Sequence, residues 1–70
     1  MIRLNGVEYE YRPGQTLSEL ATEQNLIYAK TGFDKCVVIQ NSAAVPANKA
    51  PELPLNDNDT IFIVPKLDGG

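Results

Sequence analysis

The alternating pattern at the start of the chain constrains its fold most strongly. Ile2-Arg3-Leu4 and the segment from Val7 to Tyr11 alternate apolar with polar side chains, which is the period of a half-buried strand. Asn5-Gly6 lies between them, and both residue types accept a positive φ, which favours a two-residue hairpin turn. The chain is therefore predicted to open with an antiparallel hairpin, whose second strand is broken by Pro13-Gly14.

A helix is predicted directly after this hairpin. Thr16 and Glu19 have the spacing of a capping box, in which each side chain satisfies a backbone N–H near the start of a helix. Three apolar residues follow at helical spacing: Leu17, Leu20 and Ala21. The pattern predicts a helix over residues 17 to about 24. Residues 25–35 fit either a second short helical turn closed by Gly32 or a loop.

The second half of the chain is predicted to supply three more strands. The apolar run Cys36–Gln40 is typical of a central strand buried on both faces, and Ala43–Val45 can pair back after a turn. Three prolines make residues 46–58 an irregular connection, in which Leu53 and Leu55 are expected to reach the core. Thr60–Val64 is the last strand, and this order predicts an α+β roll with a mixed sheet over one helix.

Length and charge exclude several classes of protein. Seventy residues form one domain with little room for a deep substrate cavity. The net charge is −3 and the six basic residues are scattered, which argues against a nucleic-acid surface. The single cysteine permits no internal disulfide, and neither a signal peptide nor an apolar run of membrane-spanning length is present. We therefore expect a cytoplasmic protein that binds no membrane.

Few residues in the chain could support catalysis or bind a metal. It contains no histidine, so Thr16 and Ser18 have no base to activate them, and one cysteine cannot make a zinc site. Cys36 opens an apolar strand and is expected to pack as a small hydrophobe. Asp57-Asn58-Asp59 lacks the glycine of a calcium loop and predicts a turn. No catalytic residue and no metal site are expected.

The sequence ends with Leu67-Asp68-Gly69-Gly70, and the paired glycines are a candidate reactive end. Glycine makes up about 7% of average composition, so two in the last two places arise by chance in roughly one chain in 200. They leave a carboxylate on a sterically bare arm that could enter the active site of another protein. A frayed terminus without function is the alternative.

The length, the element order and this ending resemble the β-grasp, ubiquitin-like sulfur carriers of the ThiS/MoaD superfamily, and most of all the ThiS-type carriers of thiamine biosynthesis. The matching motifs are the Asn5-Gly6 turn, Pro13-Gly14-Gln15-Thr16-Leu17, Val37-Val38-Ile39, Val45-Pro46, the Asp57-Asn58-Asp59 turn and Gly69-Gly70. The resemblance implies a β-grasp domain over residues 1–65, with four to five strands on one main helix. Residues 66–70 would form a flexible tail.

The resemblance also implies a function. A carrier of this kind is not an enzyme and binds no cofactor itself; an E1-like, ThiF-type adenylyltransferase uses ATP and Mg²⁺ to adenylate its C-terminal carboxylate, here that of Gly70. A sulfur donor then converts the adenylate to a thiocarboxylate, which supplies sulfur to a ThiG-type thiazole synthase or another acceptor enzyme. Leu67, Asp68 and Gly69 would thread into the partner, and the free carrier is expected to be a monomer.

The last strand would carry the docking surface for such a partner. Strand alternation places one pair of its side chains on each face of the sheet. The resemblance implies that Ile61 and Ile63 are the pair that faces the helix. Phe62 and Val64 would then face outward, where an exposed aromatic beside a reactive end could bind a partner enzyme.

Three alternatives remain open at this point. The chain could carry sulfur for another product, such as molybdopterin, cysteine or methionine. It could be a ubiquitin-like modifier that is joined to lysines of target proteins through Gly70. It could also be an interaction module whose terminal glycines are inert.

Overall fold

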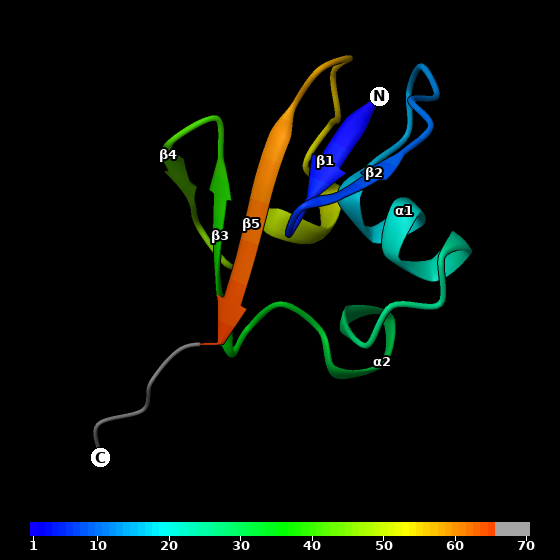
Figure 1. Cartoon of the computed structure of the whole chain (residues 1–70). Helices are drawn as coiled ribbons and strands as arrows, with labels where there is room; N and C mark the ends of the chain where they lie inside the picture. The colour runs from blue at the N-terminus through cyan, green and yellow to red at the C-terminus, as the bar shows by residue number, and fades with distance from the viewer. Residues whose placement is uncertain (66–70) are drawn as a thin grey trace.

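A five-stranded mixed sheet forms the framework of residues 1–65, the part of the chain that the computed structural model describes (Figure 1). The strands are β1 (Ile2–Leu4), β2 (Val7–Tyr9), β3 (Cys36–Gln40), β4 (Ala43–Val45) and β5 (Thr60–Pro65). Their order across the sheet is β2-β1-β5-β3-β4. β1 and β5 are parallel, and the other neighbours are antiparallel. This arrangement confirms the predicted α+β, β-grasp roll.

The opening hairpin forms around the predicted Asn5-Gly6 turn. Asn5 and Gly6 have φ values of 50° and 83°, as a turn of this type requires. The alternation predicted a second strand that reaches Tyr11, but β2 ends at Tyr9. Tyr9 lies opposite Ile2, the first residue of β1, so no partner strand remains for the residues that follow.

Two helices follow the hairpin. The capping box confirms the start of α1 (Leu17–Glu23): the Thr16 hydroxyl accepts from the Glu19 N–H at 3.2 Å, and the Glu19 carboxylate accepts from the Thr16 N–H at 2.9 Å. The open segment contains α2 (Tyr28–Thr31), which ends at Gly32 with a φ of 77°. The short-helix alternative for residues 25–35 is therefore confirmed.

The helices pack on one face of the sheet, and the core lies between them and the strands. Leu17, Leu20 and Ala21 of α1 are buried, as the helical spacing predicted. The sheet side of the core consists of Ile2, Leu4, Val38, Ile61 and Ile63. In the proline-rich connection Leu55 is buried but Leu53 only half-buried. Its 3₁₀ helix, η1 (Ala50–Glu52), adds the fully buried Ala50, which the sequence analysis missed.

β3 is central in the hydrogen-bonded sheet but is not buried on both faces, so that part of the prediction was wrong. It lies between β5 and β4, yet Val38 is its only buried residue. The helices cover just one face of the sheet, and the apolar side chains that alternate with Val38 remain half-buried. Cys36 is half-buried too, and packs against the core as a small hydrophobe.

Candidate functional site

β5 is the element that leads to the candidate reactive end. Leu67, Asp68, Gly69 and Gly70 lie outside the described residues, as does the predicted tail over residues 66–70. The described part of the site therefore consists of β5 and the groups that hold it. Figure 1 shows β5 running through the middle of the sheet to the end of the molecule where α2 lies.

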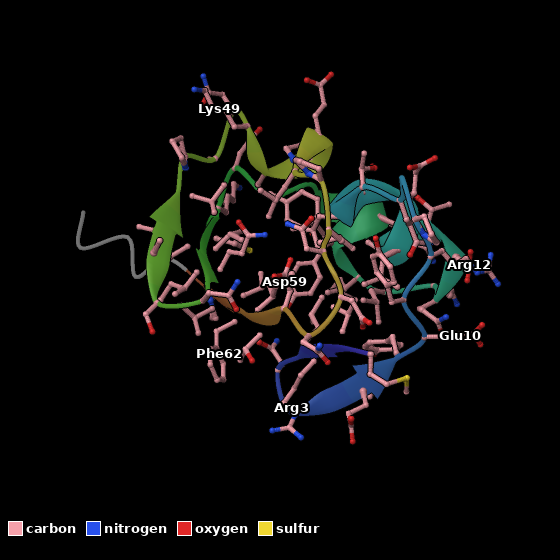
Figure 2. All side chains as sticks on the ribbon, turned by 90° about the horizontal axis from the view of Figure 1, so that it is seen from above. Arg3, Glu10, Arg12, Lys49, Asp59 and Phe62 are labelled. Atoms are coloured by element: carbon pink, nitrogen blue, oxygen red, sulfur yellow. The ribbon has the colours of Figure 1, made fainter. Side chains whose placement is uncertain are left out.

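The two faces of β5 differ as the alternation predicted. Ile61 and Ile63 are 0% and 2% exposed, because they point into the core beneath the helices. Phe62 and Val64 are 47% and 43% exposed. Figure 2 shows Phe62 projecting away from the body of the protein on the same side as Arg3 of β1. The predicted sidedness of the last strand is confirmed.

Neighbouring strands extend the exposed apolar surface beyond β5. Ile39 lies opposite Phe62 and Val37 lies opposite Val64 in the β3–β5 pairing. Ala44 of β4 lies opposite Ile39. Directly opposite residues project from the same face of a sheet. We call this set the outer patch: Val37, Ile39, Ala44, Phe62 and Val64.

The sequence analysis found only the β5 half of the outer patch. Val37 and Ile39 were assigned to a strand buried on both faces, which hid their place on the surface. Ala44 carried no signal of its own, because alanine is common in every environment. The pairing register is what brings these residues beside Phe62 and Val64.

The sheet face that the helices leave uncovered, here called the outer face, is charged where it is formed by β1 and β2. Arg3 of β1 lies opposite Glu8 of β2, and their side chains approach to 3.9 Å. Arg3 also lies opposite Thr60 at the start of β5. The outer face thus divides into a polar part on β1 and β2 and an apolar part on β3, β4 and the second half of β5. An apolar surface with a polar rim is the usual anatomy of a protein-binding site.

A buried carboxylate anchors the start of β5. Asp59 is 4% exposed and accepts hydrogen bonds from the Asn56 N–H at 2.8 Å, Gln40 Nε2 at 2.9 Å and Asn41 Nδ2 at 2.8 Å. Burial by itself raises the pKa of Asp59, but these hydrogen bonds outweigh it and hold the pKa below the ordinary Asp value. The predicted turn therefore also ties the β3–β4 hairpin to β5.

A second set of side-chain contacts holds β5 near its exit. The Asn5 side chain accepts from the Ile63 N–H at 2.8 Å and donates to the Ile63 carbonyl at 3.1 Å. The Tyr28 hydroxyl of α2 lies 3.4 Å from that carbonyl and 3.4 Å from Asn5 Nδ2. The Tyr28 ring stacks on Phe33 with centroids 5.7 Å apart. Sequence reasoning assigned Asn5 to a turn alone, and missed these contacts.

The described residues form no cluster of metal ligands. Within residues 1–65, no three His, Cys, Asp or Glu side chains gather as metal ligands would. Thr16 is occupied by the capping box with Glu19. In the same part of the chain, no helix has the length and apolar character needed to cross a membrane.

A family model matches nearly the whole chain. The sequence model of the ThiS family matches residues 2–70, which span every strand of the sheet and Gly69-Gly70. A search of curated proteins found no match.

Proposed function

Because the chain belongs to the ThiS family and is thus a small sulfur carrier protein, we propose that the Gly70 carboxylate is the group that carries the sulfur. The observation that supports this most is the family match, which includes the terminal Gly69-Gly70 pair. Glycines lack a Cβ, so nothing on these residues would crowd an attack on the terminal carbonyl.

Two covalent steps would load the carrier. An E1-like, ThiF-type enzyme with ATP and Mg²⁺ joins the Gly70 carboxylate to the α-phosphate of ATP, and pyrophosphate leaves. A sulfur nucleophile, written here as hydrosulfide, then attacks the acyl carbon; the bond to the AMP oxygen breaks and AMP departs with its electron pair. The product is a thiocarboxylate, and no oxidant or reductant is consumed. The electrostatic stabilisation of both steps would come from the partner enzyme.

The outer patch is the surface on which we propose that this partner docks. Phe62 and Val64 are exposed on the strand that directly precedes the C-terminal residues, so few residues of the chain separate an enzyme bound there from the group it would modify. Ile39 and Val37 enlarge the contact on the same face. Apolar residues at the centre of an interface are typically surrounded by a polar rim, and a few central side chains, aromatic ones among them, supply most of the binding energy.

We further propose that the sulfur goes to thiazole synthesis for thiamine, through a ThiG-type synthase. The ThiS family match supports this acceptor above the related molybdopterin, cysteine and methionine pathways. The test is to incubate the thiocarboxylate form with a ThiG-type synthase and its other substrates, and to measure sulfur in the thiazole product.

Intact-mass spectrometry tests the carrier chemistry itself. The chain is incubated with a ThiF-type adenylyltransferase, MgATP and sulfide, and one oxygen on the C-terminal peptide should be replaced by sulfur. Removing Gly70, or adding one residue after it, should abolish the exchange while the circular dichroism spectrum is unchanged. Exchange in either variant, or none in the unaltered chain with an adenylyltransferase that loads its own carrier, would refute the proposal. Higher-mass conjugates with other proteins would instead identify a modifier.

A further inference from the structure

Asn5 has two structural roles: its backbone forms the hairpin turn, and its side chain binds another strand. Its backbone adopts the positive φ of the turn between β1 and β2. Its side chain leaves that turn and binds the backbone of β5. Aspartate and glycine serve equally well in such a turn, so the turn alone does not require an amide side chain.

The Asn5 amide continues the sheet where β1 has ended. The parallel pairing of β1 with β5 stops at Leu4 and Ile61, after which the Asn5 N–H donates to the Ile61 carbonyl at 2.9 Å. The next backbone groups of β5 on this edge belong to Ile63. The Asn5 side chain forms hydrogen bonds with both the N–H and the carbonyl of Ile63, in the place of the backbone groups that a longer β1 would have supplied. The orientation of the amide follows from this pairing, because its oxygen must face the N–H and its NH₂ the carbonyl.

Within residues 1–65, these contacts are the last on this edge of β5. Strand alternation turns the Pro65 nitrogen to the same edge, and proline has no N–H to donate. Beyond Ile61, this edge of β5 is therefore held by Asn5 and by the Tyr28 hydroxyl of α2. The opposite edge is held by β3 as far as Pro65, which lies opposite Cys36.

We propose that Asn5 is a positioning residue for the reaction at the C-terminus, supported by Tyr28; this inference rests on the proposed function. Asn5 holds Ile63 to Pro65 in line with the sheet and thereby sets the direction from which the C-terminal residues enter the partner. Reactions between bound groups are sensitive to such alignment, and a displacement of about 1 Å can lower a rate about a hundredfold. Asn5 touches no reacting atom, so its effect is exerted through the backbone of β5.

Three substitutions separate this role from the turn. Asn5→Gly keeps a turn-forming residue and removes both side-chain hydrogen bonds to Ile63. Asn5→Asp also suits the turn and keeps the acceptor for the Ile63 N–H, but loses the donor for the carbonyl. Tyr28→Phe removes only the hydroxyl and leaves the ring that stacks on Phe33.

Asn25→Gly is the matched control. Asn25 has a φ of 55°, so the same substitution is made at a second residue with left-handed backbone. Asn25 is exposed and takes no part in the side-chain contacts that hold Ile63. Any effect of the glycine on the unfolded chain is therefore shared by the two variants.

Carrier-dependent ATP–pyrophosphate exchange with the ThiF-type enzyme provides the kinetic readout, at a temperature where every variant is folded by circular dichroism. For Asn5→Gly we expect kcat to fall about tenfold while KM for the carrier changes less than about twofold, because the outer patch is intact. Asn5→Asp and Tyr28→Phe should lie between this variant and the unaltered chain. Asn25→Gly should match the unaltered chain. A role in stability alone would reduce the concentration of folded carrier, and would raise the apparent KM without changing kcat.

Amide hydrogen exchange read by NMR provides the second measurement. In Asn5→Gly the Ile63 amide should exchange faster, while the Phe62 amide, which faces β3, should keep its protection. A kcat within twofold of the unaltered chain would overturn the inference, as would a lower kcat with unchanged exchange at Ile63. The proposed function is tested by the unaltered chain: if that chain is not adenylated, the carrier chemistry fails, whereas equal rates for it and Asn5→Gly refute only the positioning role.

Discussion

Ile39 and Phe62 lie directly opposite each other in the antiparallel pairing of β3 and β5. Both side chains project from the face of the sheet that the helices leave uncovered, and Phe62 is 47% exposed. A half-exposed aromatic side chain beside an aliphatic neighbour contributes little to folding and is well suited to binding. The pair lies at the centre of the outer patch, and its contribution can be measured directly.

Replacing Phe62 with alanine should weaken partner binding without unfolding the carrier. Losing an aromatic contact at the centre of an interface costs about 2 kcal/mol or more, so KM for the carrier in the adenylation assay should rise at least about tenfold. The free energy of unfolding should change by about 0.5 kcal/mol or less, because the side chain is exposed. Val7→Ala is the control, since Val7 is 52% exposed but lies on β2, outside the outer patch. Equal effects of the two substitutions on KM would refute docking at the outer patch.

Substitutions on the core-facing side of β5 should lower the stability of the protein, whereas those on its exposed side should not. Ile61 is 0% exposed, and Ile61→Ala leaves a cavity in the core that should lower the free energy of unfolding by about 2–5 kcal/mol. Val64→Ala changes an exposed side chain and should cost about 0.5 kcal/mol or less. Urea unfolding followed by circular dichroism measures both values. Similar losses in the two variants would contradict the sidedness of β5.

Asp59 should make the free energy of unfolding of the carrier depend on pH in the acidic range. Its folded pKa lies below the ordinary value of about 3.9, so its stabilising effect is present above that pH and is lost as the pH falls through the folded pKa. Asp59→Asn replaces an acceptor oxygen with a donor and should lower the free energy of unfolding at pH 7 by about 1–3 kcal/mol.

The pH dependence separates this effect from a simple packing defect. The difference between the Asp59→Asn variant and the unaltered chain should shrink as the pH falls below about 4, because the unaltered carboxylate then becomes protonated. Urea unfolding over a pH series is the measurement. Asp34→Asn, at an exposed position without a side-chain hydrogen bond in residues 1–65, is the matched control. A difference that is constant across the series would show that the charge of Asp59 is not responsible.

The capping box of α1 should contribute measurably to a domain this small. Thr16→Ala removes the oxygen that accepts from the Glu19 N–H, and should lower the free energy of unfolding by about 1 kcal/mol. Thr22→Ala removes the same atoms from an exposed site within α1 and should be neutral or slightly stabilising, because alanine favours helix. Thermal unfolding compares the variants. A loss no larger in Thr16→Ala than in Thr22→Ala would contradict the role of the cap.

The parts of the fold that were predictable depend on residues near one another in the chain. Asn5-Gly6 specifies its turn through backbone angles, and Thr16 and Glu19 specify a helix start within a single turn. The alternation of Thr60–Val64 divided its side chains between two faces, and the family resemblance indicated which pair faces the core. The errors concern β2, which ends because β1 offers no residue to pair with beyond Ile2, and β3, one face of which no helix covers.

The sequence by itself determined the hairpin, the capped helix and the alternation of the last strand, because each depends on local backbone preference or on strand periodicity. Only the tertiary structure placed Val37, Ile39 and Ala44 beside Phe62, gathered three donors around Asp59, and set Asn5 against Ile63. These contacts join distant parts of the chain. Strand register and the packing of helices on one face decide them, and no local pattern encodes either.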